Sequence, residues 1–599
     1  MHGATLLLFI LLVGLASQWL AWRVKLPSIV ILITAGFLLG PVTGIIQLAM
    51  TPEQLSGLIG LGVAIILFEG AMELKLNELK KVGHGIGRLT VVGPPLAWLL
   101  GAGAAHYIAG LSWPVAWVLG AILVVTGPTV IGPLIRQARL NKESASLLKW
   151  EGIANDPIGV LLAVLTFQYF TVAGGEFSET LVSLGTALLA AGVTGGLGGW
   201  LVGQLFRRGA VPEHLKPPML MVLVLAAYGA TDLVQHEAGL LSVTIMGVVI
   251  GNMQLIEREA LRHFKENLSV ILISVLFIVI PSQLGLSQLG LLDWRLLLFV
   301  AAVLFLVRPL TIALATIGAP MRREDKLLLA WIAPRGIVAA AAASIFGPAL
   351  VAGGHPDAER LLPIVFLVIV VTALAHGLSL GPVTRRLKLS AGRANGLLVV
   401  GATPWTHALA LALKRLEISV LVTDGSYAHL KPLRMDDIRT YYGEILSEHA
   451  EDELDTQHLS YVLAATDNDF YNALVCKARG ATFGRHRTFQ LATHQESRQE
   501  SKRMALQQRG HAAFDDGEDF NTLHERLDEG WTMQTTRLTE SYGLEKMRER
   551  LGEQGEDWVL IGGVNRDGLF QLFSEEQPFK AEHGWKMLYF APEERDEAS

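Results

Sequence analysis

The stretch "WEGIANDPIG" (residues 150–159) places three polar side chains and a proline inside an otherwise apolar segment. In a helix, Glu151 and Asn155 are four positions apart and share one face, whereas Asp156 is turned about 100° further. Pro157 has no N–H, which frees one backbone carbonyl, and it disfavours helical geometry at Asp156. A carboxylate, an amide and a spare carbonyl at one depth are hard oxygen ligands that suit a small cation or a proton.

Three other apolar segments also carry a polar residue, and two of them are interrupted by glycine and proline. Glu69 lies in "ILFEGAMEL", Thr126 in "VVTGPTVIGP" and Arg335 in "WIAPRGIVAA". Interrupted segments at corresponding positions of two halves indicate the binding site of a transporter. Gly127 and Gly336 are equally consistent with close packing of helices, so both interpretations remain open for them.

Ionisable groups inside hydrocarbon are costly, so they usually face a partner, a cavity or a pathway. For Glu151 and Arg335 we expect a structural ion pair with each other. Asp156 has two readings, a buried acid neutralised by a structural partner or a group that faces the pathway, and we favour the second. Burial disfavours the charged carboxylate, so a proton and a cation would compete for it.

Long apolar runs must position these residues. A spanning helix needs about 20 mostly apolar residues. The first run has no Lys or Arg before it, while Arg23 and Lys25 follow it, so its flanks are the reverse of those of a secretory signal and we expect it to remain as a membrane helix. The interrupted runs 114–135 and 325–350 are seven helices apart, as in an inverted repeat of six helices plus a linker helix. From the runs of about 20 mostly apolar residues, we predict thirteen transmembrane helices, at about 4–22, 27–48, 54–74, 88–110, 114–135, 148–171, 178–206, 217–236, 238–254, 266–286, 293–316, 325–350 and 361–385.

Basic residues alternate between the loops that join these segments. The loops after the odd-numbered segments are rich in Lys and Arg, whereas those after the even-numbered ones carry almost none, Arg295 and Arg360 being the exceptions. The positive-inside rule therefore places the odd-numbered loops and everything after "TRRLKLSAGR" in the cytoplasm, with the N-terminus outside. We expect a bacterial inner (plasma) membrane.

Composition agrees with a chain of two halves. The 599 residues are 51% hydrophobic and 17% charged, with a mean hydropathy of +0.41, which is too apolar for a soluble protein and too charged for a pure membrane bundle. The net charge of −6 gives no indication of a nucleic-acid partner. The single cysteine, Cys476, excludes an intrachain disulfide framework and fits a reducing compartment.

The second half begins with "NGLLVVGATPWTHALALALKRLEISVLVTD", which is typical of the strand, tight turn, helix and strand of a Rossmann-like fold. Asp424 follows Gly401 by 23 residues, near the spacing of a ribose-binding acid. The glycine fingerprint is incomplete, since Thr403 and Thr406 stand at its second and third positions, which crowds a pyrophosphate. We predict an adenine nucleotide regulator (AMP, ATP or NAD) that contacts Gly401, Thr403, Asp424 and Asp467. No ligand at all, or a bound ion, remains open, and no residues show metal-ligand spacing.

The motifs of the first 388 residues together resemble the monovalent cation:proton antiporter family, in particular the sodium/proton exchangers with an Asn-Asp pair. They include "FEGAMEL", "TGPTV", "EGIANDPIG", "SVTIMGVVIGN", "PRGIVAA" and "VTALAHGLSLGPVTRRL". The resemblance implies a homodimer in which a core of crossed broken helices moves against a dimerisation domain. It implies that Asp156 alternately carries a proton or a cation, with Thr126 and Glu69 nearby and Asn155 orienting the site. It also implies electroneutral, one-for-one exchange.

One position departs from this family pattern. Family members often have Asp after the threonine of the fifth helix, where this chain has Gly127. The change removes a carboxylate near the site. Sodium is the cation expected by default, and potassium is the alternative.

The second half resembles the TrkA-N-like domain that regulates potassium conductance in channels and transporters, over about 395–495. Its tail, about 530–599, resembles the small C-terminal partner of such domains. We therefore predict an α-helical polytopic membrane domain (1–388), a Rossmann-like nucleotide-sensing domain (394–500) and a small α+β C-terminal domain (501–599).

Two other functional classes fit the sequence less well. A potassium channel would need a "TVGYG"-type filter, which the chain lacks. A membrane reductase would need an intact glycine turn and a catalytic constellation. We therefore expect no enzyme activity, no catalytic residue and no required cofactor.

Overall fold

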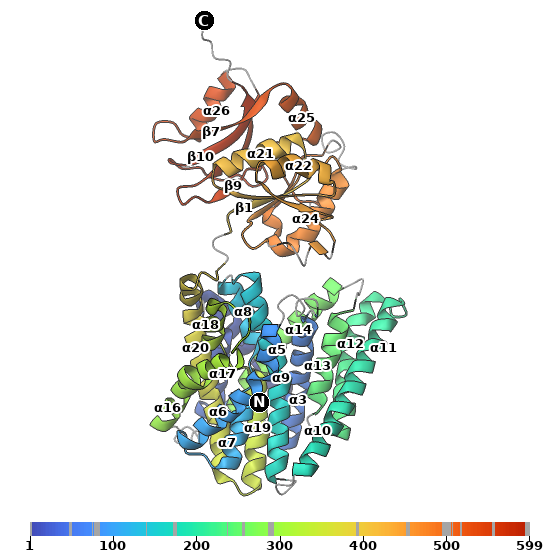
Figure 1. Cartoon of the computed structure of the whole chain (residues 1–599), viewed down its shortest axis with the longest axis vertical. Helices are drawn as coiled ribbons and strands as arrows, with labels where there is room; N and C mark the ends of the chain where they lie inside the picture. Colours follow the sequence, from blue (N-terminus) through green and yellow to red (C-terminus); the bar gives the residue numbers. More distant parts are fainter. Residues whose placement is uncertain are drawn as a thin grey trace. The chain divides into compact units, whose positions relative to one another are not determined.

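The computed structural model describes residues 3–24, 26–46, 51–74, 76, 84–138, 140–171, 177–235, 238–253, 258–285, 293–390, 394–447, 449–450, 454, 456–493, 505, 507–515, 518–553 and 557–593. The chain divides into two compact units, Met1–Ser390 and Ala391–Ser599. The first is helical and the second is α/β (Figure 1).

The described helices of the first unit follow the apolar runs of the sequence. They are α1 (Gly3–Val24), α2 (Ser28–Phe37), α3 (Pro52–Met72), α5 (His84–Val91), α6 (Gly93–Tyr107), α7 (Trp113–Ile122), α8 (Pro128–Ala138), α9 (Lys142–Thr171), α10 (Phe177–Ala191), α11 (Gly198–Arg207), α12 (Lys216–Val234), α13 (Ala238–Gly251), α14 (Arg258–Ser282), α16 (Trp294–Ala302), α17 (Arg308–Ala315), α18 (Arg323–Trp331), α19 (Ile337–Ala352) and α20 (Leu361–Arg386).

Each of the thirteen predicted segments overlaps one of these helices or a consecutive pair of them. Within the described residues, seven helices are long and apolar enough to cross a membrane, or eight if α5 and α6, which bend by 41° at their junction, form one span. Other apolar helices are shorter, among them α7 and α19, because each belongs to an interrupted segment. The predicted polytopic helical fold is confirmed.

One local expectation is wrong. Pro157 disfavours helical geometry at Asp156, yet α9 continues as one helix from Lys142 to Thr171 through that proline. Helix α9 packs against α7, α8, α3 and α19, so contacts along its length override the local preference of the residue before proline. Pro157 still lacks an N–H, so it makes no hydrogen bond to the turn before it.

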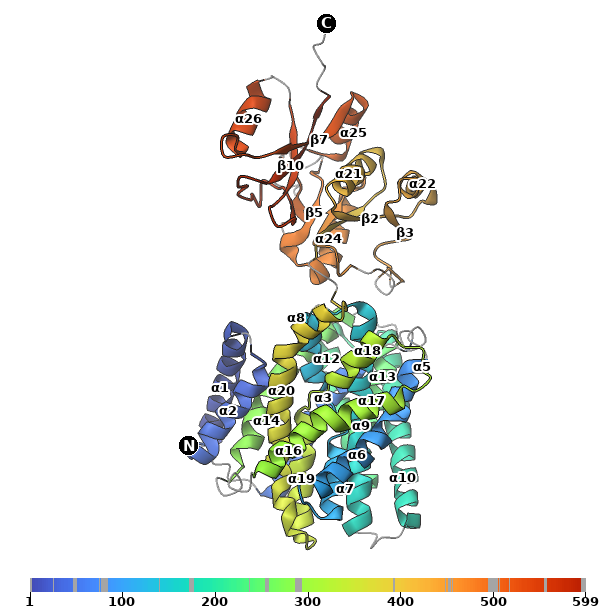
Figure 2. The same cartoon turned by 60° about the vertical axis from the view of Figure 1, so that its left-hand side comes forward.

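The helices of the first unit form groups around α9. Helices α1, α2 and α14 pack against one another, and α10, α11 and α12 pack against α13 (Figure 2). Helix α13 also lies against α3 at very short range, since a Cβ atom on Gly247 would lie 2.6 Å from the carbonyl oxygen of Phe68. Just after α13, the Asn252 amide donates to the Leu74 carbonyl oxygen at 2.7 Å. The "SVTIMGVVIGN" motif therefore stabilises a helix contact.

The second unit contains two sheets and the helices that cover them. The first sheet is parallel, with strand order β3-β2-β1-β4-β5-β6, and the second is antiparallel, with order β7-β10-β8-β9. The first order is that of doubly wound nucleotide-binding folds, with the switch point beside β1. The elements are β1 (Gly396–Val400), α21 (Pro404–Arg415), β2 (Ser419–Asp424), α22 (Tyr427–Met435), β3 (Arg439–Tyr442), β4 (Tyr461–Ala464), α24 (Asp469–Phe483), β5 (Thr488–Gln490), β6 (His511–Ala512), α25 (Phe520–Asp528), β7 (Trp531–Arg537), α26 (Leu544–Glu553), β8 (Val559–Val564), β9 (Phe570–Leu572) and β10 (Lys586–Pro592). Because β6 lies after residue 500, we propose that the Rossmann-like domain extends to Ala512.

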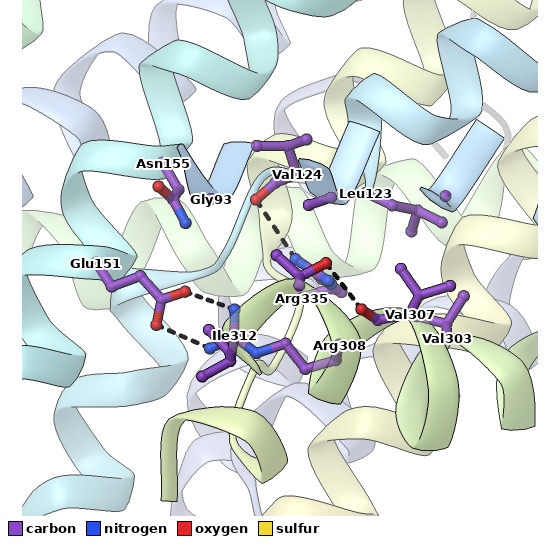
Figure 3. A pocket seen from close by; sticks show the side chains of 13 residues that line it. Gly93, Leu123, Val124, Glu151, Asn155, Val303, Val307, Arg308, Ile312 and Arg335 are labelled. Carbon is purple, nitrogen blue, oxygen red and sulfur yellow. Dashed lines mark hydrogen bonds and ion pairs between the residues drawn. The ribbon is translucent and has the colours of Figure 1, made fainter. Parts of the chain in front are cut away.

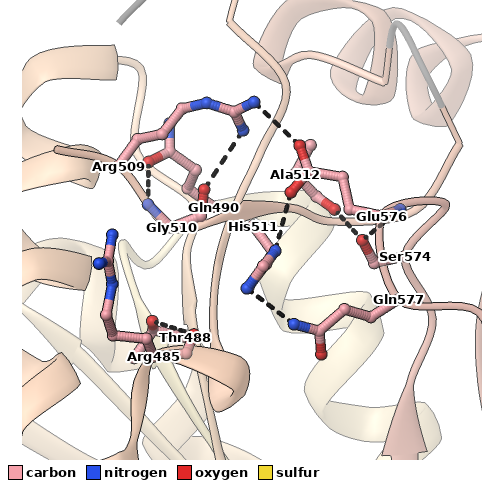
Figure 4. A network of polar contacts seen from close by, with 10 residues as sticks. All are labelled: Arg485, Thr488, Gln490, Arg509, Gly510, His511, Ala512, Ser574, Glu576 and Gln577. Atoms are coloured by element: carbon pink, nitrogen blue, oxygen red, sulfur yellow. Dashed lines mark hydrogen bonds and ion pairs between the residues drawn. The ribbon is translucent and has the colours of Figure 1, made fainter. Parts of the chain in front are cut away.

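An apolar contact and a polar network join the two sheets. The Trp405 ring of α21 is fully buried, with its centroid 5.7 Å from that of Phe514 and 6.4 Å from that of Phe590. Arg509 donates to a Glu576 oxygen at 2.9 Å, and the His511 ring contacts the other oxygen at 2.8 Å (Figure 4). Burial opposes ionisation of Glu576, but its hydrogen bond with His511 and the charge of Arg509 outweigh that effect and lower its pKa.

Candidate functional site

The break between α7 and α8 meets the break between α18 and α19 at two glycines. The Gly127 N–H donates to the Pro334 carbonyl oxygen at 3.0 Å. A Cβ atom on Gly127 would lie 2.7 Å from the Cα atom of Gly336, and a Cβ atom on Gly336 would lie 2.6 Å from the Cα atom of Gly127. The packing interpretation of these glycines is confirmed, because a side chain on either would overlap the other segment. Both also lie where a helix is interrupted, and their place in a binding site stays a prediction.

Two arginines satisfy carbonyl groups that the breaks leave without a helical partner. Arg335 donates to the Val125 carbonyl oxygen at 3.1 Å, just after α7. Arg308 donates to the carbonyl oxygens of Leu329 and Ile332, at 2.8 and 3.0 Å, at the end of α18. Since the last carbonyls of a helix have no intrahelical donor, each guanidinium stabilises one break.

Glu151 pairs with Arg308 rather than with the predicted Arg335. Its two carboxylate oxygens accept hydrogen bonds from the two terminal nitrogens of Arg308, at 2.5 and 2.8 Å. Both side chains are buried, where a charge pair is stable only if further hydrogen bonds satisfy it. The predicted Glu151–Arg335 ion pair is therefore wrong, because the Arg335 guanidinium lies against the carbonyl groups after α7.

Asp156 is completely buried, and neither of its carboxylate oxygens has a hydrogen-bond partner among the described residues. The same holds for the side-chain oxygen of Asn155. The Thr126 hydroxyl donates to the Gly152 carbonyl oxygen of α9, one turn before Asp156, at 3.2 Å. The Thr126 backbone N–H and the Arg335 guanidinium both lie close enough to act on the Asp156 carboxylate. The structure thus gathers Thr126, Asn155 and Asp156 beside the crossing of the breaks.

A small pocket lies between Asn155, Glu151 and the two arginines. In Figure 3, Arg308 points toward Glu151, and Arg335 comes from another element and points toward the carbonyl group of Val124. The pocket has a volume of about 20 Å³, which is enough for about one water molecule. The Asn155 oxygen and the Arg335 Nε, both without a partner in the described part of the chain, belong to residues that line it.

Glu69 lines a second and much wider cavity, of about 720 Å³, between α1, α2, α3, α8, α9 and α14. The same cavity contains the ion pair of Glu73 with Lys149, whose charged atoms are 2.9 Å apart. Among the described residues, Ile153 lines this cavity and Asp156 does not. The cavity reaches α9 at Ile153, about one helical turn before Asp156.

This arrangement suits reversible binding of a positive charge. A buried carboxylate without a hydrogen-bond donor is unstable as an anion, and a proton or a small cation removes that cost. The Asp156 and Asn155 oxygens are hard ligands of the kind that alkali cations accept. The glutamate–arginine pair is satisfied by its own hydrogen bonds, so it supports the site without competing for the ion.

The predicted nucleotide site is a pocket of about 320 Å³ at the carboxyl ends of the parallel strands, and Gly401, Asp424 and Asp467 are among the residues that line it. Gly401 has a φ of +106°, and a Cβ atom there would lie 2.8 Å from the Ala465 carbonyl oxygen, so the turn requires glycine. Thr403 does not line this pocket and instead caps α21, accepting a hydrogen bond from the Thr406 N–H at 3.2 Å.

Backbone N–H groups of the glycine turn are already hydrogen-bonded within the protein. The Ala402 N–H donates to Asp424 at 2.8 Å, and the Thr403 N–H donates to the Thr406 hydroxyl at 2.8 Å. Pro404 has no N–H at all. In dinucleotide-binding folds such groups bind the pyrophosphate, so this turn has fewer donors for phosphate than its fold predicts.

Two further residues of this pocket were not identified from the sequence. The Tyr471 hydroxyl donates to a Glu444 oxygen at 2.5 Å, and both side chains line the pocket beside Asp424 and Asp467. Burial, followed by the Glu444 carboxylate, raises the pKa of the Tyr471 phenol. The pocket thus has three carboxylates, and no Lys or Arg is among its described lining residues.

A family model described as "Sodium/hydrogen exchanger, transmembrane" matches residues 7–386, which is more than half of the chain. The chain belongs to the sodium/hydrogen exchanger family. The exchanger is therefore a cation:proton antiporter and not an enzyme, as its motifs predict. A second model, the TrkA-N domain, matches residues 397–508 and confirms the predicted Rossmann-like domain.

Relatives of this exchanger include antiporters named for each of the two cations. The chain is 27% identical over 402 residues to a K(+)/H(+) antiporter NhaP of Alkalimonas amylolytica, covering 64% of this chain and 67% of the relative. It is 28% identical over 354 residues to the Na(+)/H(+) antiporter 1 of Methanocaldococcus jannaschii, covering 56% and 81%. The solved structure of the sodium proton antiporter MjNhaP1 from the same archaeon matches with a TM-score of 0.59 at 24% identity, covering 64% of this chain and 97% of that one.

Two buried residues of the exchanger were missed by sequence reasoning. Arg308 stands in "FLVRPLTIALA", where an arginine within an apolar run is a usable signal. His376, in α20, is fully buried with its ring 5.6 Å from that of Trp331. His376 lies within the motif "VTALAHGLSL". Its neighbours in the sequence are mostly apolar, so the sequence gave no indication of which residue it contacts.

Proposed function

We propose that the protein exchanges one monovalent cation for one proton and that Asp156 is the carboxylate for which they compete. The observation that carries this proposal is the complete burial of Asp156 with both oxygens free of hydrogen-bond partners among the described residues. A carboxylate that served only structure would be expected to have donors around it. This one is satisfied only when an ion or a proton arrives.

The exchange follows from the charge of that site. The bare carboxylate is held back by the cost of a buried charge, whereas its protonated and cation-loaded forms are neutral and can change their exposure from one side to the other. Each passage in one direction with a cation then alternates with a passage in the other direction with a proton. A single carboxylate carries a single positive charge, which makes the exchange electroneutral.

The surrounding residues have separate roles in this proposal. Asn155 contributes its side-chain oxygen to the cation. Thr126 donates its only hydroxyl proton to Gly152, so its lone pairs can also face a cation. Glu151, Arg308 and Arg335 keep the breaks in place and do not bind the ion. Glu69 belongs to the wide cavity by which we expect ions to approach.

Sodium is the proposed cation, with potassium as the second candidate. Relatives with each name are similar to this chain, so similarity alone does not choose between them. Gly127 leaves the first break without a carboxylate, and fewer charged ligands favour a larger, more weakly hydrated cation. This observation is what keeps potassium as an alternative.

The second unit is proposed to be a cytoplasmic regulator that responds to an adenine nucleotide. Its support is the TrkA-N match and the pocket that Gly401, Asp424 and Asp467 share. We further propose a homodimer in a bacterial inner membrane, with the N-terminus outside. The orientation rests on the alternation of basic loops.

The test is proton flux in proteoliposomes driven by gradients of sodium, potassium or lithium, with and without AMP, ATP and NAD. Asp156→Asn should reduce cation-driven proton movement to the level of empty vesicles. Asp232→Asn, the same change on α12, is the matched control and should retain exchange. Robust exchange by Asp156→Asn would overturn the proposal.

A further inference from the structure

A groove lies where α21 of the Rossmann-like domain packs on the antiparallel sheet. It has a volume of about 350 Å³, within the size range of small-molecule sites. Its walls carry three cationic side chains from three different elements, and no acidic residue is among the described residues that line it. The lining residues are Ala412, Arg415, Leu416, Met533, Thr535, Thr536, Arg537 and Lys586.

Two of these cations are direct cross-strand neighbours. Lys586 is the register partner of Arg537 in the antiparallel pair of β10 and β7, so both side chains leave the sheet on the same face. Like charges at opposed positions of an antiparallel pair are destabilising. Neither residue has an ion-pair partner among the described residues, so the protein itself does not neutralise this repulsion.

The third cation comes from the helix that covers this face. Arg415 is the last residue of α21, and α21 packs against β7. The Ala412 and Leu413 carbonyl groups at the end of that helix already accept hydrogen bonds from backbone N–H groups. Arg415 is exposed, so its guanidinium is available to an anion in the groove.

The glycine turn of the same unit has the opposite character. Three carboxylates, those of Asp424, Glu444 and Asp467, line its pocket, and its N–H groups at Ala402 and Thr403 are internally bonded. A phosphate would meet repulsion there and few donors. In the groove it would meet three cations, the hydroxyl of Thr535, which shares the face of Arg537 on β7, and an apolar floor.

We propose that this groove binds the phosphate of a soluble, mononucleotide-sized anion. Such a ligand would link α21 to β7 and β10, and so couple the Rossmann-like domain to the C-terminal sheet. The inference deepens the proposed nucleotide regulation, on which it rests for the class of ligand. It replaces the pocket of Gly401, Asp424 and Asp467 by the groove as the place where the phosphate binds.

The test is isothermal titration of pyrophosphate and of ATP into the purified full-length protein in a neutral detergent, which requires no transport. The double variant Arg537→Gln/Lys586→Gln should bind both ligands at least about tenfold more weakly, because two charge-assisted contacts are lost. Lys580→Gln, an exposed lysine of the same unit outside the groove, should bind as the wild type does. Equal affinity of the wild type and the double variant, or no binding to the wild type up to about 1 mM, would overturn the proposal.

A second variant distinguishes the groove from the glycine turn. Asp467→Asn removes a negative charge from the turn pocket, so it should tighten pyrophosphate binding only if the phosphate binds there; unchanged affinity supports the groove. A lipid headgroup is tested by adding phosphatidylglycerol to the micelles. The choice of a soluble ligand is wrong if the wild type shows no heat of binding for pyrophosphate but does show one for phosphatidylglycerol, and if the double variant shows neither.

Discussion

The helical unit and the α/β unit each place an aspartate beside a glycine-containing break or turn, but the two aspartates differ in how their charge is satisfied. Asp156 is fully buried, and neither of its carboxylate oxygens has a well-formed hydrogen bond in the described part of the protein, although the Thr126 backbone N–H lies near them. Asp424 accepts hydrogen bonds from the N–H groups of Ala402 and Ser426, at 2.8 and 2.7 Å. The same residue type is therefore left unsatisfied in one unit and satisfied by the backbone in the other.

This difference is the basis on which we propose Asp156, and not Asp424, as an ion site. A buried charge without partners costs stability, so its presence is explained best by a ligand that comes and goes. A carboxylate that two backbone N–H groups satisfy stabilises the turn that it contacts, and it has less capacity left for a ligand. Burial and hydrogen bonding therefore distinguish the two aspartates more clearly than sequence motifs do.

The Asp156→Asn variant tests the difference between the two aspartates most directly, and its thermal stability is as informative as its transport activity. Exchange should disappear, while the thermal unfolding midpoint in detergent should stay or rise, because an unpartnered buried charge is replaced by a neutral amide. The measurement is a melting curve of the purified full-length protein at neutral pH. A large fall in the midpoint would mean that Asp156 has a structural partner.

Breaking the buried ion pair should have the largest effect on stability. Arg308→Gln leaves Glu151 buried without its partner and should cost about 3–5 kcal/mol. A double-mutant cycle with Glu151→Gln should show strong coupling to Arg308. The same cycle with Arg335→Gln should show weaker coupling to Glu151. Stronger coupling of Glu151 to Arg335 than to Arg308 would instead support the ion pair predicted from the sequence.

The satisfied aspartate should give a smaller and purely structural effect. Asp424→Asn exchanges a charged acceptor for a neutral amide and should cost about 1–3 kcal/mol around β1 and β2. Hydrogen–deuterium exchange of the full-length protein reports the opening free energy of these strands. Asp467→Asn, in the same pocket, is the control and should change it by less than about 0.5 kcal/mol.

The smallest expected effect is the pH dependence of the contact between the two sheets. The pKa of Glu576 is lowered in the folded protein, so its contribution is complete above the unfolded value of about 4.3 and is lost as the pH falls through the lower folded value. Hydrogen exchange near β6 should therefore accelerate at acid pH. Glu576→Gln should remove that dependence, whereas an unchanged profile would exclude Glu576 as its origin.

The sequence predicts the helices of the membrane unit well because each is long and apolar, and both breaks carry glycine and proline. The strands β1 and β2 and the turn between them were likewise predictable from local patterns. These features depend on residues that are close together in the chain, so local propensity and hydrophobic patterning are sufficient to find them.

The partners within the site were harder to predict, since they depend on distances across the sequence. Glu151 has two buried arginines within reach, and which of them binds it is decided by the carbonyl groups of Val125 and Leu329 that each guanidinium also contacts. The uninterrupted course of α9 through Pro157 has a similar origin, because neighbouring helices pack along it. Asp156, Asn155 and Thr126 could be named from their motifs, while the position of Glu69 in a wide cavity could not.

The contact between Gly127 and Gly336 has a consequence for how this protein can change by mutation. Both positions already have the smallest side chain, so neither can shrink to accommodate a larger residue at the other. An aspartate at position 127 would place its Cβ atom 2.7 Å from the Cα atom of Gly336. That substitution therefore requires the two segments to move apart, so it cannot be accommodated without further changes at the crossing. Close approach of the two segments and a carboxylate at position 127 exclude each other.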